Sequence, residues 1–408
     1  MSSNITPEFI RAIPKTDLHV HLDGSVRIPT LIELAREQGV DLPSTTEEGL
    51  RELVFRDRYD SLVEYLSGFA YTCAVLQDAE SLERCAFELA SDAFDEGVRY
   101  LEVRFAPQLH VGPDLDTSET LRAVAKGLAR AETHYNEAMS GKPGGGPLYR
   151  TAIIVCAMRM FTEEFSSYFR DYVRVHRHRP MRNIIAQASV DLAHAAVAAR
   201  DQYGLPIVGF DLAGQEDGYP ASAHREAYDY AHRNFLKKTV HAGEAFGPES
   251  IFQAITELNA DRIGHGYHVF SPEKVSDPGI EDSAAYVADL AGWIADRRIT
   301  IEVCLSSNMQ TNPEIPDLQE HNFRKMLEAR LSVTLCTDNR TVSNTTVCKE
   351  TELAVEHFGI DGGALKNLVV YGFKRSFFPG SYKEKRTYVR HCIDFYETLE
   401  RQHGVEHG

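Results

Sequence analysis

Eight short apolar runs, separated by longer segments of helical periodicity, are the feature of this sequence that most restricts its fold. The runs are rich in Val, Ile and Leu, which is typical of parallel strands buried on both faces. Helical periodicity is clearest in 78–96, where apolar residues recur at spacings of three and four. We expect strands at residues 16–22, 99–107, 150–158, 205–213, 238–243, 262–267, 299–305 and 332–337.

This alternation predicts an α/β fold with a parallel sheet, but it is compatible with both a closed barrel and an open doubly wound sheet. His19 and His21 lie two apart on the first strand, so their side chains point to the same face. His241 lies in the fifth strand, and Asp338 directly follows the eighth. Side chains from these three strands can meet only if the sheet closes. We therefore expect a (β/α)8 TIM barrel with helical insertions near the mouth.

Length and charge narrow the class of protein further. The 408 residues exceed the roughly 250 of a minimal barrel, and we expect a single domain over 1–408 with its barrel core at about 14–375. The net charge of −17 disfavours binding to nucleic acid or to anionic lipid. Residues 1–10 lack the pattern of a signal peptide, and no apolar run approaches the ~20 residues of a membrane span. We expect a cytoplasmic protein.

A metal ion is the simplest reason for two imidazoles to share one face, although an HxH sequence alone is equally typical of an ordinary apolar strand. His265, in Arg262-Ile-Gly-His-Gly-Tyr267, falls at the same predicted rim. The seven cysteines include no CxxC pair, which excludes the cysteine-ligated zinc site of the small nucleobase deaminases. Any metal site should therefore use histidine and carboxylate ligands.

Six motifs, taken together and in order, resemble the adenosine deaminase family of the metal-dependent amidohydrolase superfamily. The resemblance extends over most of the chain, and the joint match is far more specific than any single motif. The motifs are Thr16-Asp-Leu-His-Val-His-Leu-Asp-Gly-Ser25, Asp211-Leu-Ala-Gly214, His241-Ala-Gly-Glu244, Ile263-Gly-His-Gly266, Ser306-Ser-Asn308 and Thr337-Asp-Asn339.

The resemblance implies one zinc ion per chain, held by His19, His21, His241 and Asp338 with a further position left for water. Zinc brings the pKa of bound water down to about 7, so a metal-bound hydroxide would attack C6 of a purine at neutral pH. Glu244 would protonate purine N1 as C6 becomes tetrahedral. His265 would orient the hydroxide, while Asp338 would both bind the metal and accept a hydrogen bond.

The resemblance also assigns the residues that would bind the substrate. The backbone N–H of Gly214 would donate to purine N3, Asp23 would contact a ribose hydroxyl, and His21 would lie against the substrate. Many family members have two successive aspartates after the last strand, whereas this chain has Asp338-Asn339. An amide donates at any ordinary pH, so we expect Asn339 to donate to purine N7. The apolar stripe of 59–76 resembles the family's hydrophobic cover, although the pattern alone is typical of plain core.

The implied activity is conversion of adenosine, and of 2′-deoxyadenosine, to inosine and ammonia, with a purine nucleoside as the only partner that the sequence suggests. Another 6-aminopurine, such as adenine or a 5′-substituted adenosine like aminodeoxyfutalosine, would need the same catalytic residues. AMP is disfavoured because the rim motifs contain no basic cluster for a phosphate. A two-metal hydrolase would need a lysine at the end of the fourth strand, where this chain has Asp211-Leu-Ala-Gly214. A non-catalytic purine-binding protein on the same fold is a further alternative.

Overall fold

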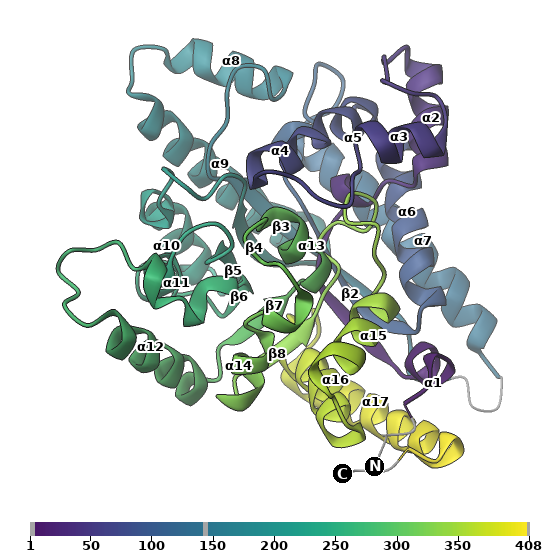
Figure 1. Cartoon of the computed structure of the whole chain (residues 1–408). Helices are drawn as coiled ribbons and strands as arrows, with labels where there is room; N and C mark the ends of the chain where they lie inside the picture. The colour runs from purple at the N-terminus through teal and green to yellow at the C-terminus, as the bar shows by residue number, and fades with distance from the viewer. Residues whose placement is uncertain (1–4, 142–145, 406–408) are drawn as a thin grey trace.

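Eight parallel strands form the centre of the molecule in a computed structural model that describes residues 5–141 and 146–405 (Figure 1). Neighbouring strands pair in chain order. The strands are Lys15–His21 (β1), Val98–Phe105 (β2), Arg150–Met158 (β3), Ile207–Ala213 (β4), Lys237–Ala242 (β5), Arg262–His265 (β6), Thr300–Val303 (β7) and Ser332–Leu335 (β8).

The sheet closes where the segment after β8 meets β1. The backbone N–H of His21 donates to the carbonyl of Asp338, and the N–H of Asp338 donates to the carbonyl of His19, both at 2.7 Å. Val20 and Asp338 form a parallel bridge at the same place. These bonds confirm the predicted (β/α)8 barrel over an open sheet, and they fix a proposed metal ligand at the seam.

Every predicted strand is present, with ends that differ by two residues at most. The bounds of β3 are as predicted, while β2, β6, β7 and β8 each end two residues early. His265, the last residue of β6, has φ +62°, and Asp338 has φ +60°. A left-handed backbone costs a non-glycine residue about 1–2 kcal/mol, so a strand cannot continue through such a position. Two of the seven non-glycine residues with positive φ in the described part of the chain thus lie at the candidate site.

Local sequence explains why the clearest predicted helix begins and ends where it does. The side chain of Asp78 accepts a hydrogen bond from the N–H of Ser81, an N-cap that begins α6. Gly97 follows the helix with φ +88°, a conformation that suits glycine. The helix spans Ala79–Asp95, so the prediction of 78–96 is confirmed.

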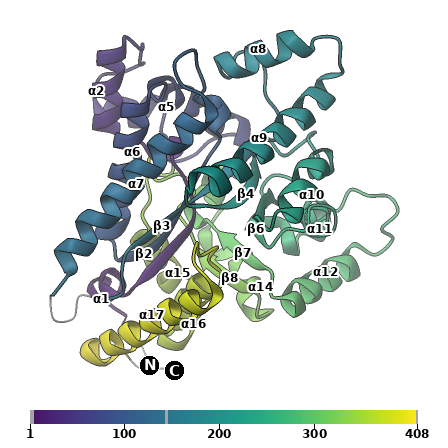
Figure 2. The same cartoon turned by 180° about the vertical axis from the view of Figure 1, so that it is seen from behind.

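The helices surround the strands, and several of them cross the back of the sheet in Figure 2. They are Pro7–Ala12 (α1), Ile28–Gln38 (α2), Glu47–Leu53 (α3), Leu62–Ser67 (α4), Phe69–Val75 (α5), Ala79–Asp95 (α6), Thr117–Met139 (α7), Ser167–His176 (α8), Met181–Tyr203 (α9), Arg225–Arg233 (α10), Pro248–Thr256 (α11), Ser283–Arg297 (α12), Leu305–Thr311 (α13), Phe323–Glu328 (α14), Val347–Phe358 (α15), Gly362–Arg375 (α16) and Tyr382–His403 (α17).

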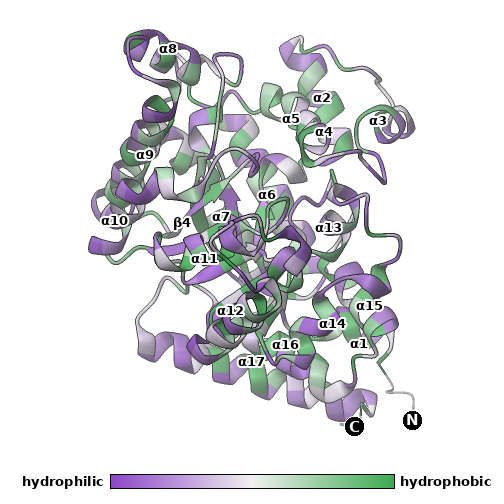
Figure 3. Cartoon of the chain, turned by 60° about the vertical axis from the view of Figure 1, so that its left-hand side comes forward, coloured by the Kyte–Doolittle hydropathy of each residue, from purple (hydrophilic) through white to green (hydrophobic). Residues whose placement is uncertain are grey.

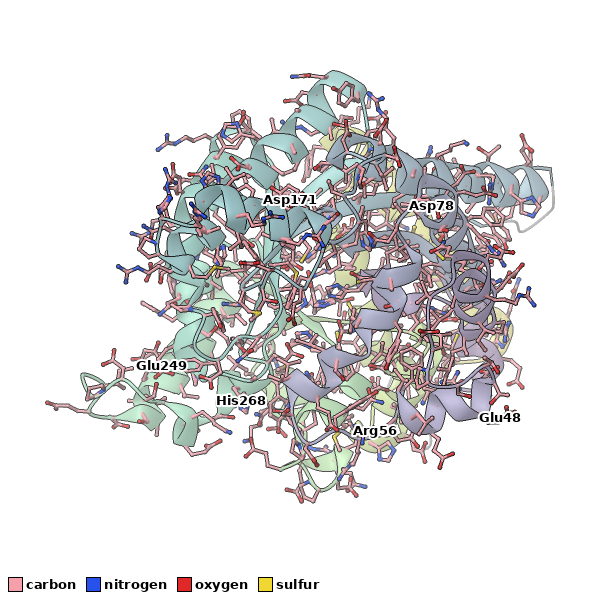
Figure 4. The ribbon with its side chains drawn as sticks, turned by 90° about the horizontal axis from the view of Figure 1, so that it is seen from above. Glu48, Arg56, Asp78, Asp171, Glu249 and His268 are labelled. Atoms are coloured by element: carbon pink, nitrogen blue, oxygen red, sulfur yellow. The ribbon has the colours of Figure 1, made fainter. Side chains whose placement is uncertain are left out.

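Four helices, α2–α5, are inserted between β1 and β2. Figure 4 views the molecule from their side, with Glu48 and Arg56 marking this segment. The apolar stripe predicted over 59–76 is only partly continuous, because the helix is interrupted at Gly68 and Val63 is 54% exposed. Tyr59 and Tyr65 are buried instead. The segment is two short helices whose aromatic side chains face inward.

Hydropathy follows this layered arrangement. In Figure 3 hydrophobic residues gather on the strands, while outer helices such as α10 and α17 show hydrophilic stretches. The described ends of the chain lie on one side, close to α1 and α17 (Figures 1 and 2). Within residues 5–141 and 146–405, no helix has the length and apolar content needed to cross a bilayer.

Candidate active site

Four buried side chains from three separate strands converge at the carboxyl rim of the barrel, as predicted. Nε2 of His21 lies 3.1 Å from Nε2 of His241. Oδ1 of Asp338 lies 3.2 Å from Nε2 of His19 and 3.4 Å from Nε2 of His21. All four residues are at most 9% exposed. The barrel therefore brings together the side chains of β1, β5 and the end of β8.

The hydrogen bonds of two of these histidines show what the cluster can bind. His19 Nδ1 lies 2.8 Å from a Glu302 oxygen, and His241 Nδ1 lies 3.1 Å from an Asp211 oxygen. A carboxylate only accepts, so each Nδ1 carries a proton, and each Nε2 presents a lone pair when its ring is neutral. Nε2 of His19 finds no hydrogen-bond partner within the described residues. Lone pairs that face one another and a carboxylate fit a divalent cation.

The two carboxylates that orient these histidines are joined by a buried cation. Arg104 donates to Asp211 and to Glu302, each at 2.8 Å. Arg262 also donates to Glu302, at 2.6 Å. Burial alone would raise the pKa of Glu302, but the charges of Arg104 and Arg262 outweigh burial and lower it. The network therefore holds Glu302 ionised against His19, which fixes the orientation of the imidazole.

The apolar runs and the motifs do not predict this network, although the strand sequences contain a signal for it. Glu302 is the one charged residue in Thr300-Ile-Glu-Val303, and Arg104 lies in Leu101-Glu-Val-Arg-Phe105. A charge inside a strand that is buried on both faces must point into the barrel and needs a partner there. Glu302 and Arg104 are both charges of this kind.

Glu244 lies beside the cluster with its carboxyl group protected from water. The residue is 5% exposed, and its Oε2 lies 3.7 Å from Nε2 of His265. Burial raises its pKa well above the ordinary range, and the nearby charge of Asp338 adds to this effect. A raised pKa favours the protonated carboxyl, which can donate a hydrogen bond or a proton.

A chain of hydrogen bonds assigns the proton of His265. The backbone N–H of Phe323 donates to His321 Nδ1 at 2.9 Å, so the proton of neutral His321 is on Nε2. That group donates to Asn308 Oδ1 at 3.2 Å, which leaves Asn308 Nδ2 facing His265 Nδ1 at 3.1 Å.

The amide therefore donates to His265 Nδ1, and the remaining proton of neutral His265 is on Nε2. Burial lowers the pKa of His265, in agreement with a neutral ring. Distance alone would admit His265 as a ligand, because His19, His241, His265 and Asp338 offer ligand atoms within 4.8 Å of one another. The proton on Nε2 of His265 argues against this role, because an N–H group has no free lone pair to bind a metal. Among the described residues, His21 is the other imidazole at this centre, with its Nε2 3.1 Å from Nε2 of His241.

The proposed substrate-binding residues border this centre. Asp23 is buried just beyond β1, where Cys73 and His110 lie within 4.8 Å of it. Burial raises the pKa of Asp23 to about 7 and lowers that of His110 to about 4. Gly214 follows β4 with φ +98°. Cys73 and His110 carried no sequence signal that marked them, since each lies in an ordinary apolar segment.

Asn339 is engaged within the protein. Its Nδ2 donates to the hydroxyl of Tyr65 at 2.8 Å, and that hydroxyl lies 2.8 Å from Oγ of Ser343. One amide hydrogen is left for a ligand. The predicted contact with purine N7 stays a prediction, and the cover helix α4 is tied directly to the proposed substrate contact.

A closed parallel barrel with a His/Asp cluster able to hold a metal at its carboxyl rim, beside a buried carboxyl, defines a hydrolase barrel of the amidohydrolase type. The adenosine deaminase family model matches residues 14–389. An adenosine deaminase of Mycolicibacterium gilvum is 36% identical over 379 residues, 92% of this chain and 94% of that protein. The chain belongs to the adenosine deaminase family, so it is a hydrolytic deaminase that acts on a C–N bond.

Other similar proteins differ in length or in the ligand they contain. A probable adenosine deaminase of Dictyostelium discoideum is 34% identical over 92% of this chain, which spans only 42% of that longer protein. An Arabidopsis protein solved with IMP superimposes with TM-score 0.73 and 25% identity, over 97% of this chain and 99% of its own. A zinc-bound amidohydrolase of Burkholderia ambifaria, 20% identical, has the same fold, with TM-score 0.74 over 98% and 96% of the two chains.

Proposed function

We propose that this protein is a zinc-dependent deaminase that converts adenosine and 2′-deoxyadenosine to inosine and ammonia. The observation that carries the proposal is the buried carboxyl of Glu244 next to a centre of imidazole lone pairs and a carboxylate. Hydrolysis of a 6-aminopurine needs both parts, a nucleophile at C6 and a proton for N1. The adenosine deaminases of similar sequence support adenosine as the substrate.

One zinc ion per chain would be held by His19, His21, His241 and Asp338. The unpartnered lone pair of His19 and the short approach of His21 to His241 support this set. When bound, zinc acidifies a water molecule and so supplies hydroxide at neutral pH. Glu302 and Asp211 keep the imidazoles of His19 and His241 in the orientation that presents Nε2.

The residues around the centre would carry the rest of the reaction. Addition of water to C6 places a proton on N1, which the protonated carboxyl of Glu244 donates. The Nε2–H of His265 donates to the attacking oxygen and holds it near C6. The proton lost from water restores the carboxyl of Glu244, and the proton of the hydroxyl group on tetrahedral C6 passes to the amino nitrogen. Cleavage of the C6–N bond then forms the 6-oxo group, leaves the donated proton on N1 and releases ammonia. Asp338 accepts a hydrogen bond from Ser307 at 2.7 Å, which keeps its second oxygen in place.

Asp23, Gly214, Asn339 and His21 would hold the nucleoside. A hydroxyl donor suits the surroundings of Asp23, because Cys73 and neutral His110 offer no positive charge to a phosphate. This observation favours a nucleoside over a nucleotide. The Arabidopsis structure solved with IMP is the reason to keep AMP as the second candidate.

The test is ammonia release, together with the ultraviolet change from 6-aminopurine to 6-oxopurine, from zinc-loaded protein. Adenosine, 2′-deoxyadenosine, adenine, AMP and a 5′-substituted adenosine are assayed in parallel. We expect the highest kcat/KM with adenosine. Preference for AMP or adenine would contradict the substrate assignment and keep the chemistry, whereas no turnover of any of the five would contradict both.

A further inference from the structure

The carboxylate of Glu216 receives an unusual number of hydrogen bonds. Its Oε1 accepts from the backbone N–H of Gly243 at 2.7 Å and from the hydroxyl of Ser250. Its Oε2 accepts from the N–H groups of Glu244, Ala245 and Phe246 at 3.0, 2.8 and 3.0 Å. Four consecutive backbone N–H groups therefore converge on one buried side chain.

The arrangement needs the ionised form of Glu216. Burial alone would raise its pKa, but the charge of Arg159 and the hydrogen bonds from Ser250 and the loop backbone outweigh burial and lower it. Successive N–H groups that converge on an anion form a nest, in which the charge is stabilised by oriented dipoles. Glu216 therefore substitutes for the bound anion that such a loop would otherwise attract.

Arg159 strengthens the same region from the end of β3. Its guanidinium donates to the carbonyl of His241 and, at 2.9 Å, to the carbonyl of Tyr219. Its own backbone N–H donates to the carbonyl of Ala213 at 2.8 Å. The segments that follow β3, β4 and β5 are thus bonded to one another around Glu216.

The two loops that Glu216 joins carry two different proposed contacts to one purine ring. Gly214, two residues before Glu216, is the proposed donor to N3. Glu244, within the loop that Glu216 binds, is the proposed donor to N1. N1 and N3 flank C2 in the same six-membered ring, so the spacing of the two loops sets whether both contacts can form at once.

We propose that Glu216 is a positioning residue that fixes loop 243–246 against the loop after β4, and so sets Glu244 at the distance from Gly214 that the purine ring requires. The roles of Gly214 and Glu244 in this inference rest on the proposed function. The hydrogen bonds to Glu216 do not. A shift of about 1 Å in a catalytic group can cost about 100-fold in rate.

The kinetic test compares Glu216→Gln and Glu216→Asp in zinc-loaded protein. The amide of Gln turns an NH2 group toward the backbone N–H groups, so these donors lose an acceptor and the negative charge. We expect kcat for adenosine to fall about 100-fold in Glu216→Gln, with KM within about threefold and zinc content unchanged. Glu216→Asp keeps the charge, so its kcat should be at least about tenfold higher than that of Glu216→Gln. Equal losses in both variants, or a change confined to KM, would overturn the proposal.

Glu132 provides the matched control. It also accepts a backbone N–H and a hydroxyl, both from Thr151, at 2.5 and 2.7 Å, but at the amino end of β3, the opposite rim. Glu132→Gln should lower the unfolding temperature as Glu216→Gln does, and should leave kcat within about twofold. An equal loss of kcat in Glu132→Gln would mean that Glu216 contributes to stability alone and does not position Glu244.

Hydrogen exchange separates this proposal from the proposed function, because it needs no substrate. The amides of 243–246 should be protected in the wild type and exchange at least about tenfold faster in Glu216→Gln, but not in Glu132→Gln. If Glu216→Gln fails to fold, Ser250→Ala takes its place, because it removes one donor and keeps the carboxylate. The amides of 243–246 should then exchange faster than in the wild type, by a smaller factor. Fast exchange of these amides in the wild type would overturn the inference even if the protein turns over adenosine. Protected amides in a protein that does not turn over adenosine would contradict only the proposed function.

Discussion

Two buried carboxyls at the carboxyl rim, those of Asp23 and Glu244, differ from the buried charges of the barrel interior in how they are compensated. In the interior, Glu102 and Glu302 are paired with Arg262, and Arg104 lies between Glu302 and Asp211. At the rim, neither Asp23 nor Glu244 forms an ion pair with a lysine or arginine among the residues that the structure describes, and the pKa of each carboxyl is raised by burial.

Paired buried charges keep neighbouring side chains in position, whereas unpaired buried carboxyls can take part in the reaction. A paired buried charge keeps its protonation state and its position, because removing either partner leaves the other uncompensated. An unpaired buried carboxyl takes up a proton and can release it to a ligand. The interior network thus orients the imidazoles, and the rim keeps the protonated acid. Four predictions test this division.

The largest effect should follow Glu244→Gln. The variant removes the proposed proton donor but no ion pair, so kcat for adenosine should fall about 1,000-fold while the unfolding temperature and the zinc content stay close to the wild type. Steady-state kinetics, thermal unfolding and metal analysis measure the three quantities. A loss of stability comparable to the loss of rate would place Glu244 with the paired interior charges and contradict the comparison.

Glu302→Gln tests the interior in the same way. It leaves Arg104 and Arg262 with less compensation and removes the carboxylate that orients His19, so the metal-free protein should lose about 3 kcal/mol of unfolding free energy. Zinc affinity should fall about 10–100-fold. Denaturant unfolding and competition with a chelator measure these changes. Unchanged stability would show that the two arginines are compensated by Glu102 and Asp211 alone.

How far the sequence predicts this protein differs between the same two regions. The eight strands, the closure of the barrel and the convergence of His19, His21, His241 and Asp338 followed from apolar runs and motif positions. These features depend on patterns that extend over several residues or on strand ends that share one rim.

The remaining contacts depend on single side chains that meet across distant segments. Glu302 and Arg104 are 198 residues apart, and Glu216 contacts loop 243–246 because β4 and β5 lie side by side in the sheet. No local period marks such pairs. The contact between Tyr65 and Asn339 likewise depends on how α4 lies over the rim, which the apolar stripe in 59–76 did not predict.

A smaller effect should come from a neutral buried histidine near the rim. Burial and the charge of Arg159 lower the pKa of His224 to about 3, and its Nδ1 lies 2.7 Å from Oγ of Ser189. Because the folded pKa is lower than the unfolded pKa of about 6.5, the unfolded state takes up the proton first and stability falls as the pH drops below about 6.5.

His224→Gln removes this contribution. Between pH 6 and pH 5, the unfolding free energy of the wild type should fall more steeply than that of the variant, by up to about 1.4 kcal/mol per pH unit. Denaturant unfolding at several pH values measures the slopes. Parallel slopes would mean that His224 is charged in the folded protein, and the contrast between paired and neutral buried groups would then fail at this position.

The smallest effect should follow Tyr65→Phe, which tests whether the cover and the rim act together. The variant removes the hydroxyl that accepts from Asn339, so the amide loses the bond that orients it toward the substrate. A neutral hydrogen bond contributes about 0.5–1.5 kcal/mol, so KM for adenosine should rise about three- to tenfold while kcat changes little. Tyr59→Phe is the matched control, since that hydroxyl donates to the carbonyl of Val54 in the same segment, at 3.0 Å, and makes no contact with Asn339. If both variants raise KM equally, the cover acts by its packing alone, and the link between Tyr65 and the substrate contact is wrong.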